Sequence, residues 1–305
     1  MDLKQLQALV AVADHKTFSA AARSLHTVQS NVSAHVAHLE AELGVTLVDR
    51  ARQQLTEEGH AVVARARLIG AELAHLANDL ASITSEITGE VAMGSIGTTG
   101  RWLLPDLLRR LEIAHPGIRL VVSESVTTSL VPRLLTGQLD MAVLNLPLGE
   151  PELRVVPLFE EELVLVAPPD HRLAAGTGPI SLRELAGEEL LLGPPGTILR
   201  EDIDAAAADV GVELRARAEV DGVRLIASLA FLGFAPTIVP ATAIPSWVTT
   251  PNWASRPLRE SLRRKVGLAI PRRGLPSAPA DAVRTALLTV VRDVGALVPG
   301  IHLLD

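Results

Sequence analysis

One run of apolar residues constrains the fold of this 305-residue chain more than any other feature. Apolar side chains recur there at alternating intervals of four and three positions: Val62, Ala66, Ile69, Leu73, Leu76, Leu80, Ile83 and Ile87. This spacing predicts one long helix, from about residue 56 to residue 88, with a continuous apolar seam. At ~1.5 Å per residue such a helix would span roughly 48 Å. A small domain cannot bury a seam of that length. The simplest partner is the same helix of a second chain, and the alternative is a helix lying across its own domain.

Residues 15–59 lead into this helix and have the pattern of a short helix, a tight turn and a second helix. Ser19 is the predicted N-cap of the short helix, and Gly44 is the predicted glycine that ends the second one. The second helix, from about residue 29 to residue 43, is predicted to bury one stripe: Val32, Val36, Leu39 and Leu43. Its other face carries small and polar residues that can approach base edges, as in a helix-turn-helix docked in the DNA major groove. Residues 45–56 then predict a short two-stranded wing.

From residue 89 onward predicted strands alternate with predicted helices, which indicates parallel α/β sheets covered by helices. The strands are expected near residues 91–96, 118–124, 139–144, 163–167, 189–192, 234–239 and 266–270. The helices are expected near residues 97–114, 129–136, 197–210, 223–232 and 280–297. A chain of this length is expected to form two domains, each with its own core.

Composition excludes several classes of protein. Forty-eight per cent of the residues are apolar, which is too many for a disordered chain. No apolar run is long enough to predict a membrane span, and the N-terminus lacks the pattern of a signal peptide. We therefore expect a cytoplasmic protein with no membrane partner. The sequence has no cysteine, so disulfides, thiolate metal sites and a cysteine nucleophile are excluded. The formal net charge of −7 does not by itself indicate nucleic-acid binding.

The N-terminal pattern resembles the DNA-binding domain of the LysR-type transcriptional regulators. The resemblance rests on residues 15–26 (HKTFSAAARSLH), 27–33 (TVQSNVS) and 38–47 (HLEAELGVTL), together with Arg50, Leu55-Thr56 and Gly59. Further strings resemble the effector-binding domain of the same family. They are Leu104-Pro105, His115-Pro116-Gly117, residues 134–140 (LLTGQLD) and residues 235–240 (APTIVP). The resemblance therefore covers nearly the whole chain.

The resemblance implies a multidomain α+β fold and a sequence-specific, DNA-binding transcriptional regulator. A winged helix-turn-helix would occupy residues 1–58, a linker and dimerisation helix residues 59–89, and an effector-binding domain residues 90–305. That last domain would resemble a periplasmic solute-binding protein, with subdomain one at 90–163 and 268–305 and subdomain two at 164–267. The residues expected at DNA are Ser19, Thr27, Gln29, Ser30, Asn31, Ser33, Ala34, His38, Arg50 and Arg52.

The chain departs from the family in its charge. Arginine is usual at three positions that hold Ala20, Ala34 and Ala37, and proline is usual at the position of Ser30. Residues 1–60 contain five Lys and Arg and seven Asp and Glu, and five minus seven gives a net charge of −2. A nucleic-acid-binding domain ordinarily has a basic footprint.

A ligand of the C-terminal domain is expected in the cleft where strands end and helices begin. Three segments there combine hydroxyls with free backbone N–H groups: Thr98, Thr99, Gly100 and Arg101; Thr127, Thr128 and Ser129; Gly196 and Thr197. Helix N-termini favour anions, and an anion would offset the unfavourable position of Arg101 in a first turn. The sequence therefore predicts a small anionic effector. The alternative is that these hydroxyls only cap their helices and that Arg101 points to water.

Enzyme chemistry has no support in the sequence. No phosphate-binding loop, nucleophile elbow or zinc-protease motif occurs, and the nine histidines are dispersed. We expect no catalytic residue, no cofactor and no metal. The adjacent acids Glu160, Glu161 and Glu162 are predicted to form a solvated rim rather than an acid/base pair.

The expected partners are double-stranded DNA, a small-molecule effector and a second copy of the chain. A homodimer is the simplest assembly, while a homotetramer and a contact with RNA polymerase stay open. The acidic N-terminal domain leaves one alternative of a different class: a cytosolic solute-binding module whose N-terminal domain mainly serves assembly.

Overall fold

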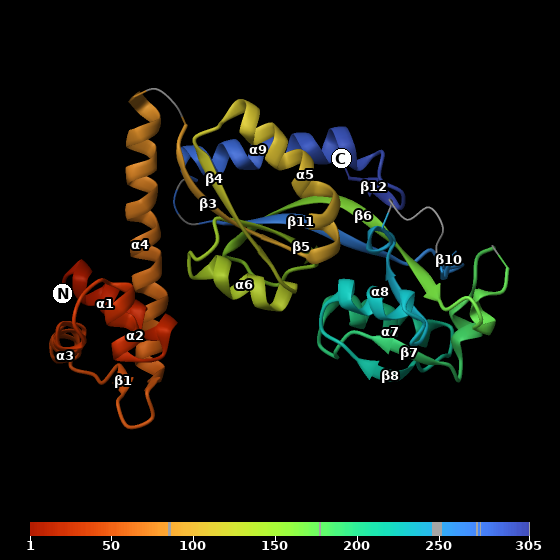
Figure 1. The fold of residues 1–305 in the computed structure, drawn as a ribbon, viewed down its shortest axis with the longest axis horizontal. Helices are drawn as coiled ribbons and strands as arrows, with labels where there is room; N and C mark the ends of the chain where they lie inside the picture. Colours follow the sequence, from red (N-terminus) through yellow and green to blue (C-terminus); the bar gives the residue numbers. More distant parts are fainter. Residues whose placement is uncertain (85–86, 177, 246–251, 273, 275, 305) are drawn as a thin grey trace. The chain divides into compact units, whose positions relative to one another are not determined.

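The computed structural model describes residues 1–84, 87–176, 178–245, 252–272, 274 and 276–304, apart from the side chains of residues 81–84. Figure 1 shows its helices and strands. The chain divides into two compact units, Met1–Ala77 with Thr136–Gln138 and Asn78–Leu135 with Leu139–Asp305.

The N-terminal unit contains three short helices, a two-stranded wing and most of a long helix. These elements are α1 (Leu3–His15), α2 (Phe18–Ser24), α3 (Gln29–Leu43), β1 (Val48–Asp49), β2 (Gln54–Leu55) and α4 (Glu57–Thr84). Apolar side chains of the three short helices share one core, in which Leu9, Val32 and Leu39 are fully buried. The two wing strands pair antiparallel. The predicted helix-turn-helix and wing are confirmed.

The predicted N-cap of α2 is wrong by two residues. Thr17, in extended conformation, is the N-cap, and its Oγ1 accepts a hydrogen bond from the Ala20 N–H at 3.2 Å. The helix therefore begins at Phe18. Ser19 lies inside the first turn, where its hydroxyl donates to Gln29 Oε1 at 2.8 Å. This bond connects α2 to the start of α3.

The apolar stripe of α3 ends one turn earlier than predicted. Leu43 is 39% exposed, whereas Leu39 is buried. Gly44 ends the helix in the left-handed region at φ 72°, as predicted. Because the chain changes direction there, Leu47 from beyond the turn fills the core in place of Leu43.

The long helix α4 has two different environments along its length. Its first turns pack on the core of the N-terminal unit, where Val63 and Ala66 are buried. The next seam residues, from Ile69 to Leu80, are 41–58% exposed. The described part of the helix runs to Thr84, and Ile87 and Thr88 are not helical, so the helix does not reach the predicted residue 88. The side chain of Ile83 lies outside the described residues. The seam available to a partner is therefore shorter than the sequence predicts, because the unit's own core takes its first positions.

The C-terminal unit is built on a ten-stranded sheet in the order β4-β3-β5-β11-β6-β9-β7-β8, with β10 and β12 also paired to β6. The strands are β3 (Gly89–Ser95), β4 (Ile118–Glu124), β5 (Met141–Leu146), β6 (Leu153–Ala167), β7 (Glu189–Leu192), β8 (Arg215–Glu219), β9 (Thr237–Pro240), β10 (Ala254–Pro257), β11 (Arg263–Pro271) and β12 (Ile301–Leu303). We call β4, β3, β5 and β11 the first half of the sheet, and β9, β7, β8 and β10 the second half.

The sheet is mixed rather than purely parallel. Strand β3 pairs in parallel with β4 and β5, and β7 pairs in parallel with β8 and β9, as the alternation of elements predicts. Strand β11 is antiparallel to both β5 and β6. Strand β6 pairs with β11 as far as Glu162 and with β9 from Leu163 onward, so this one strand runs through both halves.

Helices cover both faces of this sheet. They are α5 (Gly97–Ala114), α6 (Thr127–Leu135), α7 (Ile198–Asp209), α8 (Val223–Phe231) and α9 (Ala278–Gly295), with short 3-10 turns η1 (Arg172–Ala174), η2 (Leu182–Leu185) and η3 (Ala241–Ala243). Figure 1 shows α5 and α9 on one face of the first half and α6 on the other. The first half has separate apolar clusters under α5 with α9 and under α6. In the part of the chain that the structure describes, no helix is long and apolar enough to span a membrane.

Candidate functional site

A cavity of about 370 Å³ lies in the C-terminal unit, at the ends of strands from both halves of the sheet. Four helices begin at this cavity. Its lining includes Gly97 of α5, Thr127 and Thr128 of α6, Ile198 of α7 and Val223 of α8. The volume is within the range of small-molecule sites.

The backbone at these helix starts favours an anion. The N-cap residues of α5, α7 and α8 are Ile96, Thr197 and Gly222, and none forms a side-chain cap. Thr197 Oγ1 instead donates to the Pro194 carbonyl at 3.1 Å. The first N–H groups of a helix have no partner within it, and the aligned peptide dipoles place positive partial charge there. Several such ends at one cavity attract negative charge.

The rest of the lining divides into an apolar wall and a few charged side chains. The wall consists of Leu192, Ile198, Leu199, Ile203, Val220, Val223, Leu225, Ile226, Ile238 and Val239. The charged side chains are Arg200, Arg224, Arg264, Glu124 and Asp221. Arg224 forms an ion pair with Glu124, and Arg200 contacts Asp204 at 2.7 Å and Glu219 at 3.2 Å. A ligand here would place an apolar body against the wall and a polar end near the helix starts.

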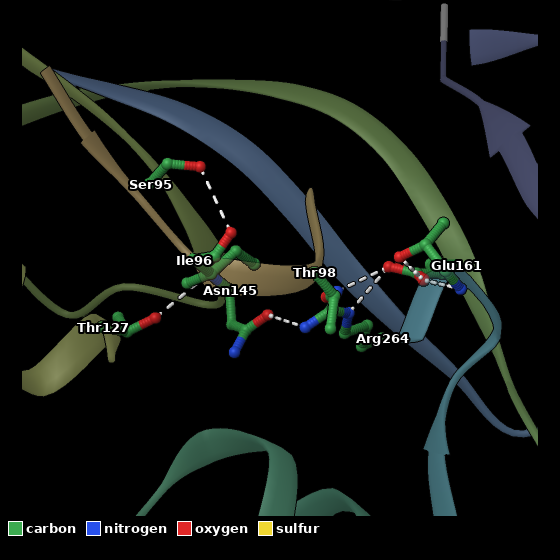
Figure 2. Close-up of polar contacts among 8 residues, drawn as sticks. Ser95, Ile96, Thr98, Thr127, Asn145, Glu161 and Arg264 are labelled. Atoms are coloured by element: carbon green, nitrogen blue, oxygen red, sulfur yellow. Dashed lines mark hydrogen bonds and ion pairs between the residues drawn. The ribbon is translucent and has the colours of Figure 1, made fainter. Parts of the chain in front are cut away.

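A buried ion pair lies at the edge of this cavity (Figure 2). Arg264 of β11 and Glu161 of β6 face each other across the strand pair and are 2% and 0% exposed. Glu161 Oε2 accepts from Arg264 Nε at 2.9 Å and from Nη2 at 2.6 Å. Glu161 Oε1 accepts from the backbone N–H of Thr242 at 2.9 Å and from its hydroxyl at 2.6 Å. Arg264 also donates to Thr98 Oγ1 at 2.5 Å and to Asn145 Oδ1 at 3.3 Å.

The prediction that Glu160, Glu161 and Glu162 form a solvated rim is wrong for the middle residue. Successive side chains of a strand point to opposite faces of the sheet. Glu160 and Glu162 therefore lie together on one face, where both meet Arg263. Glu161 lies on the other face and is fully buried.

The predicted effector residues separate into two groups. Those that line the cavity are Thr98, Thr127, Thr128 and Thr197. Those that do not are Thr99, Gly100, Arg101, Ser129 and Gly196. The helical period explains most of this division, because neighbouring helix residues point about 100° apart.

Thr99 and Arg101 have other surroundings. Thr99 is fully buried, with no hydrogen-bond partner for its Oγ1 among the described residues. Arg101 Nη1 donates to the Ala243 carbonyl at 2.8 Å, so this side chain does not point to open water. Burial lowers the pKa of Arg101, the nearby Arg224 lowers it further, and Glu124 opposes both.

Sequence reasoning missed Asn145 and Arg264 at the cavity. Asn145 is the second-last residue of strand β5 and lies one residue past the predicted strand end. Ligand-binding residues of α/β sheets are common at such strand ends. That position was a usable signal. Arg264 lies inside a strand, and no sequence pattern marks it. No group of three His, Asp or Glu side chains suited to a metal ion occurs in the described residues.

The ten residues predicted to contact DNA all lie at the surface of the N-terminal unit. Nine are exposed, and Ser33 is partly exposed. Asn31 donates to Thr27 Oγ1 at 3.0 Å, at the start of α3. Arg50 donates to Glu40 Oε2 at 3.1 Å, while Glu40 Oε1 accepts the N–H groups of the first wing residues. These hydrogen bonds to Glu40 hold the wing against α3.

Comparisons with known proteins agree with this architecture. Residues 3–60 match the bacterial regulatory helix-turn-helix proteins of the lysR family, and residues 84–292 match the LysR substrate binding domain. The chain belongs to the LysR family of transcriptional regulators. It is a DNA-binding transcription regulator with an effector-binding domain, and its family consists of regulators rather than enzymes.

Similar proteins include regulators named for hydrogen peroxide. A probable hydrogen peroxide-inducible genes activator of Streptomyces viridosporus is 32% identical over 299 residues, 96% of this LysR-type chain and 95% of that protein. The DNA-binding transcriptional dual regulator OxyR of Escherichia coli (strain K12) is 29% identical over 295 residues, 94% of this chain and 96% of that one. A full-length OxyR variant from Pseudomonas aeruginosa has a similar structure, with a TM-score of 0.74 and 26% identity, covering 96% of this chain and 95% of that one.

Proposed function

We propose that this LysR-type regulator binds a specific site in double-stranded DNA as a homodimer, under the control of a small anionic effector held in the cavity. The observation that carries the proposal is the convergence of four helix N-termini, three of them without side-chain caps, on one cavity. A carboxylate would satisfy N–H groups that no protein side chain caps. Such a regulator would act in the bacterial cytoplasm, where its DNA lies.

The proposed signal is a bound molecule rather than oxidation by peroxide. The chain has no cysteine, so a thiol cannot react with peroxide in these residues. Its sulfur atoms belong to three methionines, and Met93 and Met141 are buried in the core. A cavity of about 370 Å³ is also much larger than a peroxide molecule, since a water occupies roughly 30 Å³. We therefore do not propose hydrogen peroxide, which appears in the names of its relatives, as the effector of this chain.

Dimerisation is proposed through α4. The side chains of Ile69, Leu73, Leu76 and Leu80 leave a row of exposed apolar groups along one face of the helix. Two such helices would bury these rows against each other. A two-fold dimer presents two recognition helices to two half-sites.

The effector proposal is tested by thermal unfolding with matched ligand pairs. Benzoate and succinate are the anions, and benzamide and succinamide are their neutral counterparts. A ligand that binds only the folded state raises the melting temperature. We expect an anion to raise it more than its amide, and equal shifts would contradict the proposal.

Two threonine variants show where the ligand binds. Thr128→Val removes a hydroxyl from the cavity and should reduce the shift. Thr99→Val is the matched control, because Thr99 does not line the cavity, and its shift should equal that of the wild type. A gel-shift titration with DNA upstream of the protein's own gene tests the DNA proposal. Absence of a specific complex would favour the alternative, in which the N-terminal unit serves only assembly.

A further inference from the structure

The buried pair of Arg264 and Glu161 bears directly on which end of a ligand the cavity recognises. All hydrogen-bond acceptor sites of the Glu161 carboxylate are occupied by groups of the protein. Its two oxygens accept four hydrogen bonds, two from Arg264 and two from Thr242. An ionised carboxylate accepts about four, and a buried charge is tolerated only when it is paired and hydrogen-bonded. Glu161 therefore fixes the orientation of the guanidinium and has no capacity left for a ligand.

The guanidinium of Arg264 has more N–H donors than it has acceptors among the described residues. It has five N–H groups. Nε and Nη2 supply three of them to Glu161 and Thr98. Nη1 supplies one to Asn145 Oδ1, at 3.3 Å. Among the described residues no second acceptor for Nη1 occurs, and Arg264 lines the cavity whereas Glu161 does not.

Asn145 extends this donor edge. Because its Oδ1 accepts from Arg264, its other amide atom, Nδ2, is an N–H donor, and Figure 2 shows the two atoms on opposite sides of the amide. The backbone N–H of Asn145 is held by Thr127 Oγ1 at 3.1 Å, which fixes the residue at the end of β5. Two donors from neighbouring planar groups fit the two oxygens of one carboxylate. A cationic group at this edge would be repelled by the positive charge of Arg264.

We propose that Arg264 and Asn145 form the polar end of the effector site and select a ligand with a planar carboxylate, while Glu161 acts as a positioning residue for Arg264. This inference rests on the proposed effector function and specifies its chemistry. The apolar wall of α7 and α8 would receive the body of the same ligand. Benzoate, with one carboxylate and an apolar ring, is the matched probe.

The decisive variant is Asn145→Asp, which keeps the size of the side chain. Its carboxylate can still accept from Arg264, so the fold should persist, but it replaces a donor with negative charge. We expect benzoate affinity, measured by calorimetry on the full chain, to fall about tenfold or more. Asn252→Asp is the control. It introduces the same charge at an exposed position outside the cavity lining and should leave benzoate affinity unchanged.

Arg264→Lys provides a second measurement. It keeps the positive charge but loses the planar group that meets Glu161 and the cavity together. Benzoate binding should weaken about tenfold or more, while the preference for benzoate over benzamide should shrink toward one. Circular dichroism and operator binding show whether each variant is folded.

The outcomes separate this inference from the proposed function. Wild-type protein that binds benzoate, with folded Asn145→Asp binding it equally well, would overturn the role of Arg264 and Asn145 and leave the anionic effector standing. Wild-type protein that prefers neither carboxylate to its amide would overturn both.

Discussion

Two glycines of α4 differ completely in their surroundings. A Cβ at Gly59 would lie 2.1 Å from the backbone oxygen of Leu47, whereas a Cβ at Gly70 has nothing within 4 Å. Gly59 is buried where α4 passes the wing, and Gly70 is exposed. The first glycine is therefore required by close backbone approach, and the second only lowers helix propensity.

We predict opposite effects for alanine at these two positions. Gly59→Ala should destabilise the N-terminal unit by about 3 kcal/mol, because backbone atoms must shift to admit the methyl group. Gly70→Ala should stabilise α4 by about 1 kcal/mol. Urea unfolding followed by circular dichroism measures both. A stable Gly59→Ala protein would mean that α4 does not pass the wing as described.

A second residue-scale prediction concerns Asp202 on α7. Burial raises the pKa of this carboxyl, and the neighbouring Glu201 raises it further. The folded state therefore binds a proton more readily than the unfolded chain. The contribution of Asp202 to the free energy of unfolding falls as the pH rises from the pKa of the unfolded chain through the pKa of the folded state. At pH 7 the cost of burying the ionised carboxyl remains in full. We expect Asp202→Asn to be more stable than wild type at pH 7, with the difference shrinking on acidification.

The matched variant is Glu201→Gln, measured by urea unfolding over the same pH range. It removes only the smaller cause of the shift, so the pH dependence assigned to Asp202 should persist in reduced form. If Asp202→Asn were less stable than wild type at pH 7, the assigned burial penalty would be wrong.

Some residues of the site could be predicted from the sequence and others could not. Thr98 and Thr128 could be placed at the cavity because helix starts at strand ends are readable from the sequence. Thr99 was misplaced because the exact first residue of a helix decides which neighbour faces inward. Glu161 and Arg264 could not be paired from sequence. They lie more than a hundred positions apart, and only the register of β6 against β11 brings them together.

At the scale of elements, periodicity predicted most helices and strands, and the errors come from what lies next to them. The seam of α4 repeats from Val62, yet Ala66 packs into the core of its own unit. The spacing is identical in both regions, so it cannot tell an own-domain contact from a partner contact. Strand direction is a similar case. The apolar content of residues 266–270 predicted a strand but not its direction. Strand β11 pairs antiparallel with β5 and β6, which lie far from it in the sequence, so no local pattern indicates this pairing.

The exposed part of the seam leads to a prediction about assembly. Leu73→Asp with Leu80→Asp would place charges at the proposed helix contact, which is strongly unfavourable. We expect the double variant to elute as a monomer on size-exclusion chromatography with light scattering and to lose operator affinity. Ala74→Asp, exposed on α4 but outside the seam, should remain dimeric. A double variant that keeps the wild-type mass would remove α4 as the dimer contact.

The whole molecule combines a familiar architecture with an unusual charge distribution. The fold class and the family could be predicted from the sequence, because the helix-turn-helix string and the alternating elements span nearly the whole chain. The charge at the DNA surface differs from that expectation. Residues 1–60 are net acidic, and Arg50 is already engaged with Glu40. Permanent positive charge is therefore scarce on the surface that would face DNA.

Four of the nine histidines lie in the first 38 residues: His15, His26, His35 and His38. His38 is exposed on α3, and His35 is partly exposed beside it. A histidine side chain ordinarily becomes positively charged below about pH 6.5, and each phosphate neutralised by a protein charge adds about −0.9 to the slope of log affinity against log salt. We therefore expect the salt dependence of operator binding to be shallow at pH 8 and steeper at pH 6. One contacting histidine per subunit would change the slope by about 1.8 in a dimer.

The measurement is operator affinity against salt at pH 6 and pH 8 for wild type, His38→Ala and His115→Ala. His38→Ala should lose most of the steepening at pH 6 and resemble wild type at pH 8, because a neutral imidazole adds no charge. His115 lies at the end of α5 in the C-terminal unit, so its variant should keep the wild-type slopes. Equal wild-type slopes at the two pH values would show that these histidines do not contact phosphate. The permanent charges of Arg50 and Arg52 would then have to supply the whole salt dependence.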